Sequence, residues 1–236
     1  VGMANATALI DFVLAQPKIE LIGVYSHFAA SDGLDPFLTE QQIELFSQIA
    51  DYIQSRKPEV ICHLANSGGV AYYPKSYFDM VRPGLMSYGY FPAHAIETGP
   101  LALIQPCFSL ITRVAYFKTV PQGQGISYSH RYHTGEITNI ATMPIGYGDG
   151  YRRGLSNLGQ VLIHGKKYPI VGSVCMDMLM VDLGPEDHAE VGDEVVLIGR
   201  QGDQEILLNE LAEKLNTINY EILVGFNDRI PRVLIK

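Results

Sequence analysis

Tyrosines and glycines crowd one stretch of the sequence, and a phenol hydroxyl is the group among them that can do chemistry. Between Gly123 and Tyr151, a glycine-marked turn precedes Ser127 and Tyr128, and a later loop carries Tyr147. Tyrosine combines a rigid apolar ring with one hydroxyl that can donate a hydrogen bond or exchange a proton. The stretch is typical of a proton-transfer site, although the same pattern also fits aromatic side chains that shield the end of a β-barrel.

Three further polar features follow apolar segments in the first hundred residues. They are His27, the run Asn66–Gly69 and Arg82. In a parallel α/β sheet, functional groups gather at the carboxyl ends of the strands. Backbone N–H groups in a small-residue run before a helix can seat a phosphate, and a buried arginine needs an acceptor because it cannot lose its proton. Each feature alone also fits a structural role, but together they indicate one site.

Composition restricts the class of partner. The formal net charge of -8 argues against nucleic acid or an anionic membrane. Three cysteines are too few for a disulfide framework and fit a reducing compartment. With 47% hydrophobic and 18% charged residues, the chain resembles a compact soluble protein. No apolar run approaches the roughly 18 residues of a membrane span.

Several other reaction classes lack their motifs in this sequence. His130 and His133 have no matching Cys or His pair, so we do not expect a metal site. No phosphate-binding loop of the Walker type and no dinucleotide glycine pattern is present. Ser127 lacks a G-x-S-x-G context, which argues against a serine hydrolase.

The first part of the chain alternates strands and helices, which favours βαβ units and a parallel sheet. About 100 residues with three strand–helix units would form the second half of a (β/α)8 TIM-type barrel. A smaller doubly wound sheet is the alternative. The elements we expect are a helix at 4–16, strands at 19–28, 60–65 and 80–88, a helix opened by a Thr39/Gln42 capping box, and a short helix near Tyr72.

From residue 103 onward, strand follows strand, which favours an antiparallel β domain. We therefore expect an α/β domain at 1–102 and an all-β domain at 103–236. Glycines are expected at the turns, namely Gly165, Gly172, Gly184, Gly192 and Gly199. Near the end we expect a helix with Leu207, Leu211 and Leu215 on one face and a strand at 229–236.

Eight segments in this order resemble the alanine racemase family, pyridoxal-phosphate enzymes of fold type III. They span almost the whole chain and read VYSHFAASD, HLANSGGV, MVRPGLMSYGY, GQGISYSH, MPIGYGDGYRRG, VGSVCMDMLMVDL, VGDEVVLIG and TINYEI. The resemblance implies a barrel followed by a β domain, in agreement with the pattern of elements. It also implies that pyridoxal 5′-phosphate is the cofactor.

The resemblance assigns catalytic roles to three residues. Tyr128 would be the acid/base on the L face of the amino acid, with His27 beside it, and Arg82 would face the pyridine nitrogen. A phenol with a pKa of about 10 is a poor base at neutral pH. Our hypothesis is that the cationic network through His27 and Arg82 lowers it. An arginine at the ring nitrogen limits carbanion build-up and so favours racemisation over decarboxylation.

Binding roles follow from the same resemblance. The cofactor would be held by Arg82 and by a phosphate seat that comprises Asn66, Ser67, Gly84, Leu85 and Tyr220. The backbone of Met176, with Asp177 next to it, would bind the substrate carboxylate, and Tyr147 and Tyr151 would shape the substrate entrance. In the family these sites are built across a homodimer. Tyr128 and Met176 of one subunit would then serve the barrel of the other.

Two departures from the family pattern affect these expectations. The family's Schiff-base lysine lies in an AVVKADAYGHG-like segment, and no lysine here has that context. The sequence starts at Val1-Gly2-Met3, so we interpret it as the later portion of a racemase that is inactive by itself and folds poorly, because half a barrel exposes apolar strand edges. After TINYEI, the chain reads LVGFND where the family has a Pro/Cys-containing stretch.

The function implied is the interconversion of L-alanine and D-alanine by two-base racemisation, with D-alanine supplied for peptidoglycan in a bacterial cytoplasm. A racemase of broad amino-acid specificity is one alternative. A non-catalytic dimerisation or sensory remnant of the fold is another.

Overall fold

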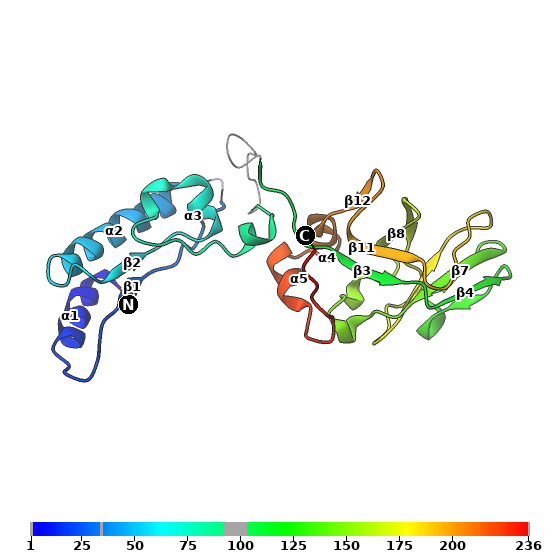
Figure 1. Ribbon diagram of the computed structural model, residues 1–236, viewed down its shortest axis with the longest axis horizontal. Helices are drawn as coiled ribbons and strands as arrows, with labels where there is room; N and C mark the ends of the chain where they lie inside the picture. The colour runs from blue at the N-terminus through cyan, green and yellow to red at the C-terminus, as the bar shows by residue number, and fades with distance from the viewer. Residues whose placement is uncertain (1, 34, 92–102, 236) are drawn as a thin grey trace. The chain divides into compact units, whose positions relative to one another are not determined.

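The computed structural model describes residues 2–33, 35–91 and 103–235 (Figure 1). It divides into two compact bodies, the N-terminal body of residues 1–107 and the C-terminal body of residues 108–236. The domain boundary expected between residues 102 and 103 adjoins the segment 92–102 and lies outside the described residues, so it stays a prediction. No helix in the described part is long and apolar enough to cross a membrane.

The N-terminal body is built on two parallel strands. Strands β1 (Gly23–Tyr25) and β2 (Ile61–His63) pair in register, and helix α2 (Phe37–Gln54) lies between them in the sequence. Helix α1 (Met3–Leu14) precedes β1, and helix α3 (Ser67–Tyr72) follows β2. The core lies between α2 and the strand pair, where Ile53 and Leu64 are fully buried. Strand, helix and parallel strand in this order agree with the expected βαβ arrangement.

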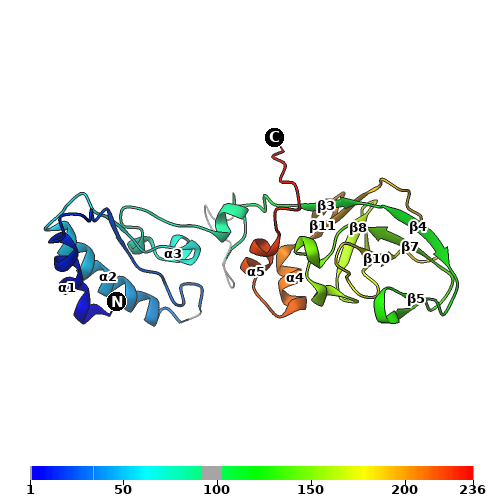
Figure 2. The same cartoon turned by 90° about the horizontal axis from the view of Figure 1, so that it is seen from below.

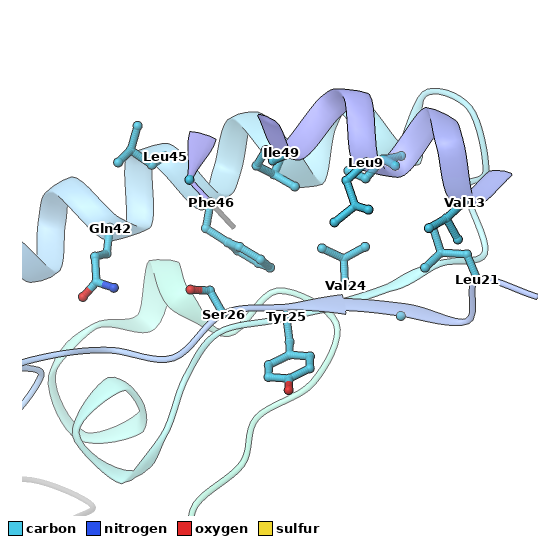
Figure 3. Close-up of a pocket in the computed structure, with 14 residues that line it drawn as sticks. Leu9, Val13, Leu21, Val24, Tyr25, Ser26, Gln42, Leu45, Phe46 and Ile49 are labelled. Carbon is cyan, nitrogen blue, oxygen red and sulfur yellow. The ribbon is translucent and has the colours of Figure 1, made fainter. Parts of the chain in front are cut away.

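The two faces of β1 differ in what they contact. Figure 3 shows Val24 pointing toward α1 and α2, and Tyr25 pointing to the opposite side. This alternation follows from the period of two residues in a strand. The helix side carries an apolar hollow of about 530 Å³, which has Leu9 and Phe46 in its lining. The side of Tyr25 is the polar side and carries the candidate chemistry.

The expected capping box of α2 is wrong. The helix begins at Phe37, so Thr39 lies within its first turn. The Thr39 hydroxyl donates to the carbonyl of Ala30 at 3.1 Å, and the Gln42 amide accepts from the backbone N–H of Ala29 at 3.0 Å. Both side chains therefore tie α2 to the loop after β1, because that loop has backbone groups that need partners.

The third strand expected at 80–88 is also absent from the described residues. The chain continues without strand pairing as far as Pro83 and then forms a 3₁₀ turn, Leu85–Tyr88. Its backbone still contacts β2 once and the segment after β2 once: the Asp79 N–H donates to the Cys62 carbonyl, and the Arg82 N–H donates to the Ala65 carbonyl. No ladder forms because the Asp79 carboxylate accepts the Cys62 N–H at 2.8 Å and Pro83 has no N–H to donate.

The C-terminal body is an antiparallel β domain (Figure 1 and Figure 2). One sheet has the order β10-β7-β4, another has β12-β11-β8-β9 with β3 paired to β11, and β5 pairs with β6. These antiparallel pairings confirm the expected class. The strands are β3 (Leu110–Arg113), β4 (Tyr116–Val120), β5 (Gly125–Ile126), β6 (Tyr132–His133), β7 (Thr138–Met143), β8 (Gln160–Ile163), β9 (Lys166–Pro169), β10 (Leu179–Asp182), β11 (Glu194–Gln201) and β12 (Gln204–Ile206).

Three local expectations for this body are corrected. Gly199 lies inside β11 and not at a turn, with a φ of 121°. A Cβ there would come within 2.7 Å of the Ser109 hydroxyl, so close packing requires the glycine. In α4 (Leu208–Leu215), the buried face contains Leu208 and Leu211, whereas Leu207 is the residue before the helix. A second helix, α5 (Asn219–Gly225), follows, and no strand forms within the described residues 229–235.

Candidate active-site residues

Arg82 joins the ends of both parallel strands on the polar side of the N-terminal body. Its guanidinium donates to the carbonyl of Ser26 at 2.8 Å and to that of Leu64 at 3.4 Å. A third hydrogen bond goes to Nδ1 of His63. The buried arginine was expected to need acceptors, and the structure supplies three for Arg82: two carbonyls at strand ends and one imidazole nitrogen.

The contact with Arg82 determines the protonation state of His63. A guanidinium has only donors, so Nδ1 of His63 must accept, and the ring carries its single proton on Nε2. Burial, and then the charge of Arg82, lower the pKa of His63, which agrees with a neutral ring. The imidazole also stacks on Tyr25, with ring centroids 5.3 Å apart and planes 8° apart. The Arg82 guanidinium lies 5.5 Å from the centroid of the Tyr25 ring.

Two of the segments expected to hold a phosphate, the start of α3 and the turn at Leu85, lie next to each other. The Ser67 hydroxyl accepts the backbone N–H of Met86 at 3.3 Å, which brings the start of α3 to the 3₁₀ turn that contains Leu85. A Cβ on Gly84 would meet no atom within 4 Å, so the space beside this residue is open. Within the described chain, we find no acceptor for the Ser67 hydroxyl proton. The arrangement provides a hydroxyl donor and open space at the same place.

Two other predicted residues have different surroundings. The Asn66 side chain caps α3, because it accepts the N–H of Gly69 at 3.0 Å and the hydroxyl of Ser31 at 2.8 Å. The His27 side chain is exposed, and its backbone carbonyl accepts from Gln42 at 3.2 Å. In the N-terminal body, it is His63 and not His27 that contacts Arg82. The catalytic role of His27 and the cofactor role of Asn66 stay predictions.

Tyr128 is presented on a tightly held loop of the C-terminal body. Its side chain is 74% exposed. On either side, Ser127 has a φ of 64° and a ψ of -176°, and Ser129 has a φ of 61°. Conformations of this kind cost about 1–3 kcal/mol each and persist where the surroundings fix them. Residues with such strain are concentrated at functional sites, so the fixed backbone favours a functional role for Tyr128.

The segment from Ser173 to Met176 adjoins both this loop and the second tyrosine loop. The Ser127 hydroxyl donates to the carbonyl of Ser173 at 2.7 Å. The carbonyls of Cys175 and Met176 accept the N–H groups of Tyr147 at 2.9 Å and Gly148 at 2.8 Å. In the part of the chain that the structure describes, the N–H of Met176 has no acceptor, so it is available to a ligand.

Close approach explains the glycines of the second tyrosine loop. A Cβ on Gly146 would lie 2.2 Å from the Cys175 carbonyl, and one on Gly148 would lie 2.5 Å from the Arg229 guanidinium. Arg229 in turn pairs with Asp177 at 2.6 Å and with Asp149 at 3.4 Å. Asp177 is thus held by a cation that sequence reasoning did not identify.

The remaining tyrosines separate by burial. Tyr147 is exposed, whereas Tyr151 is only 1% exposed, and its hydroxyl has no hydrogen-bond partner among the described residues. Burial raises the pKa of Tyr151, so this phenol stays protonated and belongs to the core of the C-terminal body. Tyr220 is half-buried on α5. The binding roles expected for Tyr147, Tyr151 and Tyr220 stay predictions.

Sequence reasoning missed His63, Tyr25 and Ser173 as members of these clusters. The stacking of Tyr25 on His63 results from strand register, since the two residues are direct partners in the β1–β2 pair. A signal was present, because His63 stands at a strand end three residues before Asn66. The register that pairs it with Tyr25 cannot be deduced from composition or periodicity.

Two family models match the chain. The model described as "Alanine racemase, N-terminal domain" matches residues 1–92, and "Alanine racemase, C-terminal domain" matches residues 107–234. The alanine racemase of Halothermothrix orenii is 42% identical over 229 residues, which are 97% of this chain and 60% of that protein. The alanine racemase of Carboxydothermus hydrogenoformans is 41% identical over 96% of this chain and 61% of its own length.

Solved structures agree. The crystal structure of alanine racemase from Bacillus anthracis with bound L-Ala-P has a TM-score of 0.88 at 36% identity, covering 100% of this chain and 61% of that one. Alanine racemase from E. faecalis has a TM-score of 0.87 at 32% identity, covering 98% and 61%. The chain thus spans about 60% of the length of the relatives it matches.

Proposed function

Because this chain belongs to the alanine racemase family, whose fold is a TIM-type barrel domain followed by an antiparallel β domain, we propose that it forms part of an enzyme that interconverts L-alanine and D-alanine. The observation that carries the proposal is the seat of Arg82. A permanently charged donor is fixed by two strand-end carbonyls and His63, beside the contact between Ser67 and Met86. The proposed phosphate seat close to Arg82 in the sequence supports a binding role for this arginine in addition to a structural one.

The residues present fit pyridoxal 5′-phosphate as the cofactor. Arg82 would face the pyridine nitrogen, and Ser67, Gly84, Leu85, Tyr220 and Asn66 would surround the phosphate. Among the described residues the Ser67 hydroxyl proton has no acceptor, and the space at Gly84 is open, which supports this placement. When bound, this cofactor supplies an electron sink that acidifies the Cα–H of an amino acid.

The charge of Arg82 favours racemisation among the reactions of such cofactors. A guanidinium stays charged in proteins, so it does not transfer a proton to the ring nitrogen. The hydrogen bond from Arg82 to His63 already uses the lone pair of Nδ1, so this imidazole offers the cluster no further base at that nitrogen. Because the ring nitrogen would stay unprotonated, little negative charge would accumulate at Cα, and return of a proton to Cα would be favoured over other reactions.

Tyr128 would move the proton on the L face of the amino acid. Its exposure on a fixed loop supports a role in a partner subunit, and we propose a homodimer in which Tyr128 and Met176 complete the partner's site. The N–H of Met176, which has no acceptor among the described residues, would hold the substrate carboxylate next to Asp177. His27 would lie beside Tyr128 in that composite site. The second base of a two-base reaction would come from outside these 236 residues, because no lysine here has the family's context.

We further propose that the D-alanine serves peptidoglycan synthesis in a bacterial cytoplasm. The alternatives differ in product. A racemase of broad specificity would act on several amino acids at comparable rates, and a non-catalytic remnant would form no D-amino acid at all. The joint presence of Tyr128, Arg82 and Ser67 weighs against the remnant, since dimerisation alone requires none of them.

The decisive experiment is the Tyr128→Phe substitution in the protein expressed together with any residues encoded upstream of Val1. Racemisation is expected to fall about 10²–10⁴-fold, the usual contribution of one acid/base group. The loss must be equal in both directions, since the two enantiomers have equal free energy. In D2O, exchange of the Cα–H of L-alanine is expected to stop, while exchange from D-alanine continues through the other base.

The control is Tyr116→Phe, which removes the hydroxyl of another exposed tyrosine, on β4. It is expected to exchange both enantiomers at the wild-type rate. Cofactor absorbance is expected to be unchanged in both variants. Equal loss of exchange from both enantiomers together with loss of the cofactor spectrum would show that Tyr128 is structural.

A further inference from the structure

The backbone of Ser127 adopts a conformation that is nearly confined to glycine. Its φ of 64° and ψ of -176° place it in the region where a Cβ is strained, and its side chain is half-buried. Such residues persist only when neighbouring contacts over-determine them, and they concentrate at functional sites. The residue that follows is Tyr128, whose ring is exposed. The strain is therefore located at the point where the direction of this ring is set.

Two reciprocal hydrogen bonds fix this conformation. The Ser127 hydroxyl donates to the Ser173 carbonyl at 2.7 Å, and the Ser173 hydroxyl donates to the Tyr128 carbonyl at 3.3 Å. Ser173 is 2% exposed, so water does not compete readily for these groups. We refer to Ser127 and Ser173, with the two hydrogen bonds between their segments, as the serine clasp.

The clasp rests on a segment that is itself anchored on both sides. The N–H of Gly172 donates to the Asn157 side chain at 2.6 Å, and the N–H of Val174 donates to the Ser156 hydroxyl at 3.0 Å. A Cβ on Gly172 would lie 2.7 Å from the Ile126 carbonyl and from the Ser127 Cβ. The two loops therefore approach each other as closely as a glycine permits.

The same segment holds the second tyrosine loop. The Cys175 carbonyl accepts from Tyr147, and the Met176 carbonyl accepts from Gly148. Tyr128, Tyr147 and Met176 thus take their positions from one short run of backbone. A shift of that run would move the proposed acid/base and the proposed carboxylate-binding N–H together.

We infer that Ser127 and Ser173 are positioning residues, whose paired hydrogen bonds hold the backbone of Tyr128 so that its phenol meets the substrate Cα at a fixed distance and angle. The inference rests on the proposed function of Tyr128. Neither serine touches the reacting atoms. Their effect on rate follows from the steep dependence of proton transfer on geometry.

The test uses Ser127→Ala and Ser173→Ala in the protein with any coding sequence that precedes Val1. Exchange of the Cα–H of L-alanine in D2O is expected to slow about tenfold in each, the rate equivalent of one hydrogen bond. Exchange from D-alanine, the KM for alanine and cofactor absorbance are expected to stay at wild-type values. The double variant is expected to lose less than the product of the two single losses, because the clasp acts as one unit.

The matched control is Ser129→Ala. Ser129 stands on the other side of Tyr128, also has a left-handed backbone, and is exposed, with no side-chain hydrogen bond within the described residues. It is expected to exchange L-alanine within about twofold of wild type. Ser127→Gly removes the hydroxyl but relieves the backbone strain. It protects the test against misfolding and is expected to slow exchange from L-alanine as Ser127→Ala does.

A readout without substrate completes the design. Amide hydrogen exchange is expected to accelerate across 127–130 in Ser127→Ala, and to be unchanged in the β4–β7 ladder. Once Tyr128 is replaced by Phe, Ser127→Ala is expected to add no further loss. If Tyr128→Phe leaves exchange from L-alanine intact, the proposed function fails. If Tyr128→Phe abolishes it while the clasp variants match Ser129→Ala, the function stands and the positioning inference is overturned.

Discussion

Replacing His63 separates the two contacts that this residue makes, and the structure gives the size of each. His63→Asn keeps an acceptor near the position of Nδ1 but removes the ring that stacks on Tyr25. His63→Phe keeps an aromatic ring and removes the acceptor. His63→Ala removes both. The three variants together show which contact holds Arg82.

The expected costs follow from these contacts. A hydrogen bond to a charged group contributes about 1.5–3 kcal/mol to stability. Arg82 and His63 are both half-buried, so water replaces part of this bond, and the expected loss of stability for His63→Phe is about 1–2 kcal/mol. The stacked pair of Tyr25 and His63 contributes about 0.5–1 kcal/mol. His63→Asn is therefore expected to lose about 0.5–1 kcal/mol, and His63→Ala, which removes both contacts, about 1.5–3 kcal/mol.

The pH dependence has a definite sign. Burial and the charge of Arg82 lower the pKa of His63 below its ordinary value of about 6.5. The unfolded chain therefore binds this proton before the folded chain does, and stability decreases as the pH falls below about 6.5. His63→Asn has no proton to bind and is expected to lose less stability over the same interval.

The assay is urea unfolding at several pH values in the protein with any coding sequence that precedes Val1. Amide exchange of Ser26, whose N–H donates to the His63 carbonyl, reports on the N-terminal body alone. If His63→Phe is as stable as wild type while His63→Asn is the costlier change, Arg82 does not depend on this acceptor and the reasoning is refuted.

Two further predictions concern stability. Gly199→Ala is expected to destabilise the C-terminal body by about 2–4 kcal/mol, because a φ of 121° is combined with a clash at Ser109. Gly184→Ala is expected to cost only about 1–2 kcal/mol, because its φ is 78° and no atom lies within 4 Å of the added Cβ. Equal midpoints of urea unfolding for the two variants would contradict the packing argument. The 236-residue chain expressed alone is expected to melt without a sharp transition in its N-terminal body. In the described part of that body β1 and β2 are the only strands, and Ile22 before β1 and Ile61 in β2 are exposed. A sharp calorimetric transition that amide hydrogen exchange assigns to residues 1–107 would contradict this prediction.

Local sequence patterns predicted the class of each body and failed where a distant segment competed for the same atoms. The Thr39/Gln42 pattern has the form of a capping box, but both side chains bond to the loop after β1. Residues 80–88 have the apolar run of a strand, but the Asp79 carboxylate takes the Cys62 N–H that a ladder would need. Gly199 was expected at a turn, but it lies within β11, where the lack of a Cβ allows Ser109 to pack closely against it.

The sequence by itself determined that an arginine in the third apolar segment needs acceptors, that small residues after a strand lie near it, and that Tyr128 stands on a glycine-shaped loop. These conclusions depend on properties that each side chain has in any environment, such as a proton that cannot be lost. Only the tertiary structure decided that the acceptors include His63, that Tyr151 is buried, and that Ser173 holds Tyr128. Strand register and loop packing bring together residues 19 and 45 positions apart in these contacts, and no local pattern encodes which residues meet.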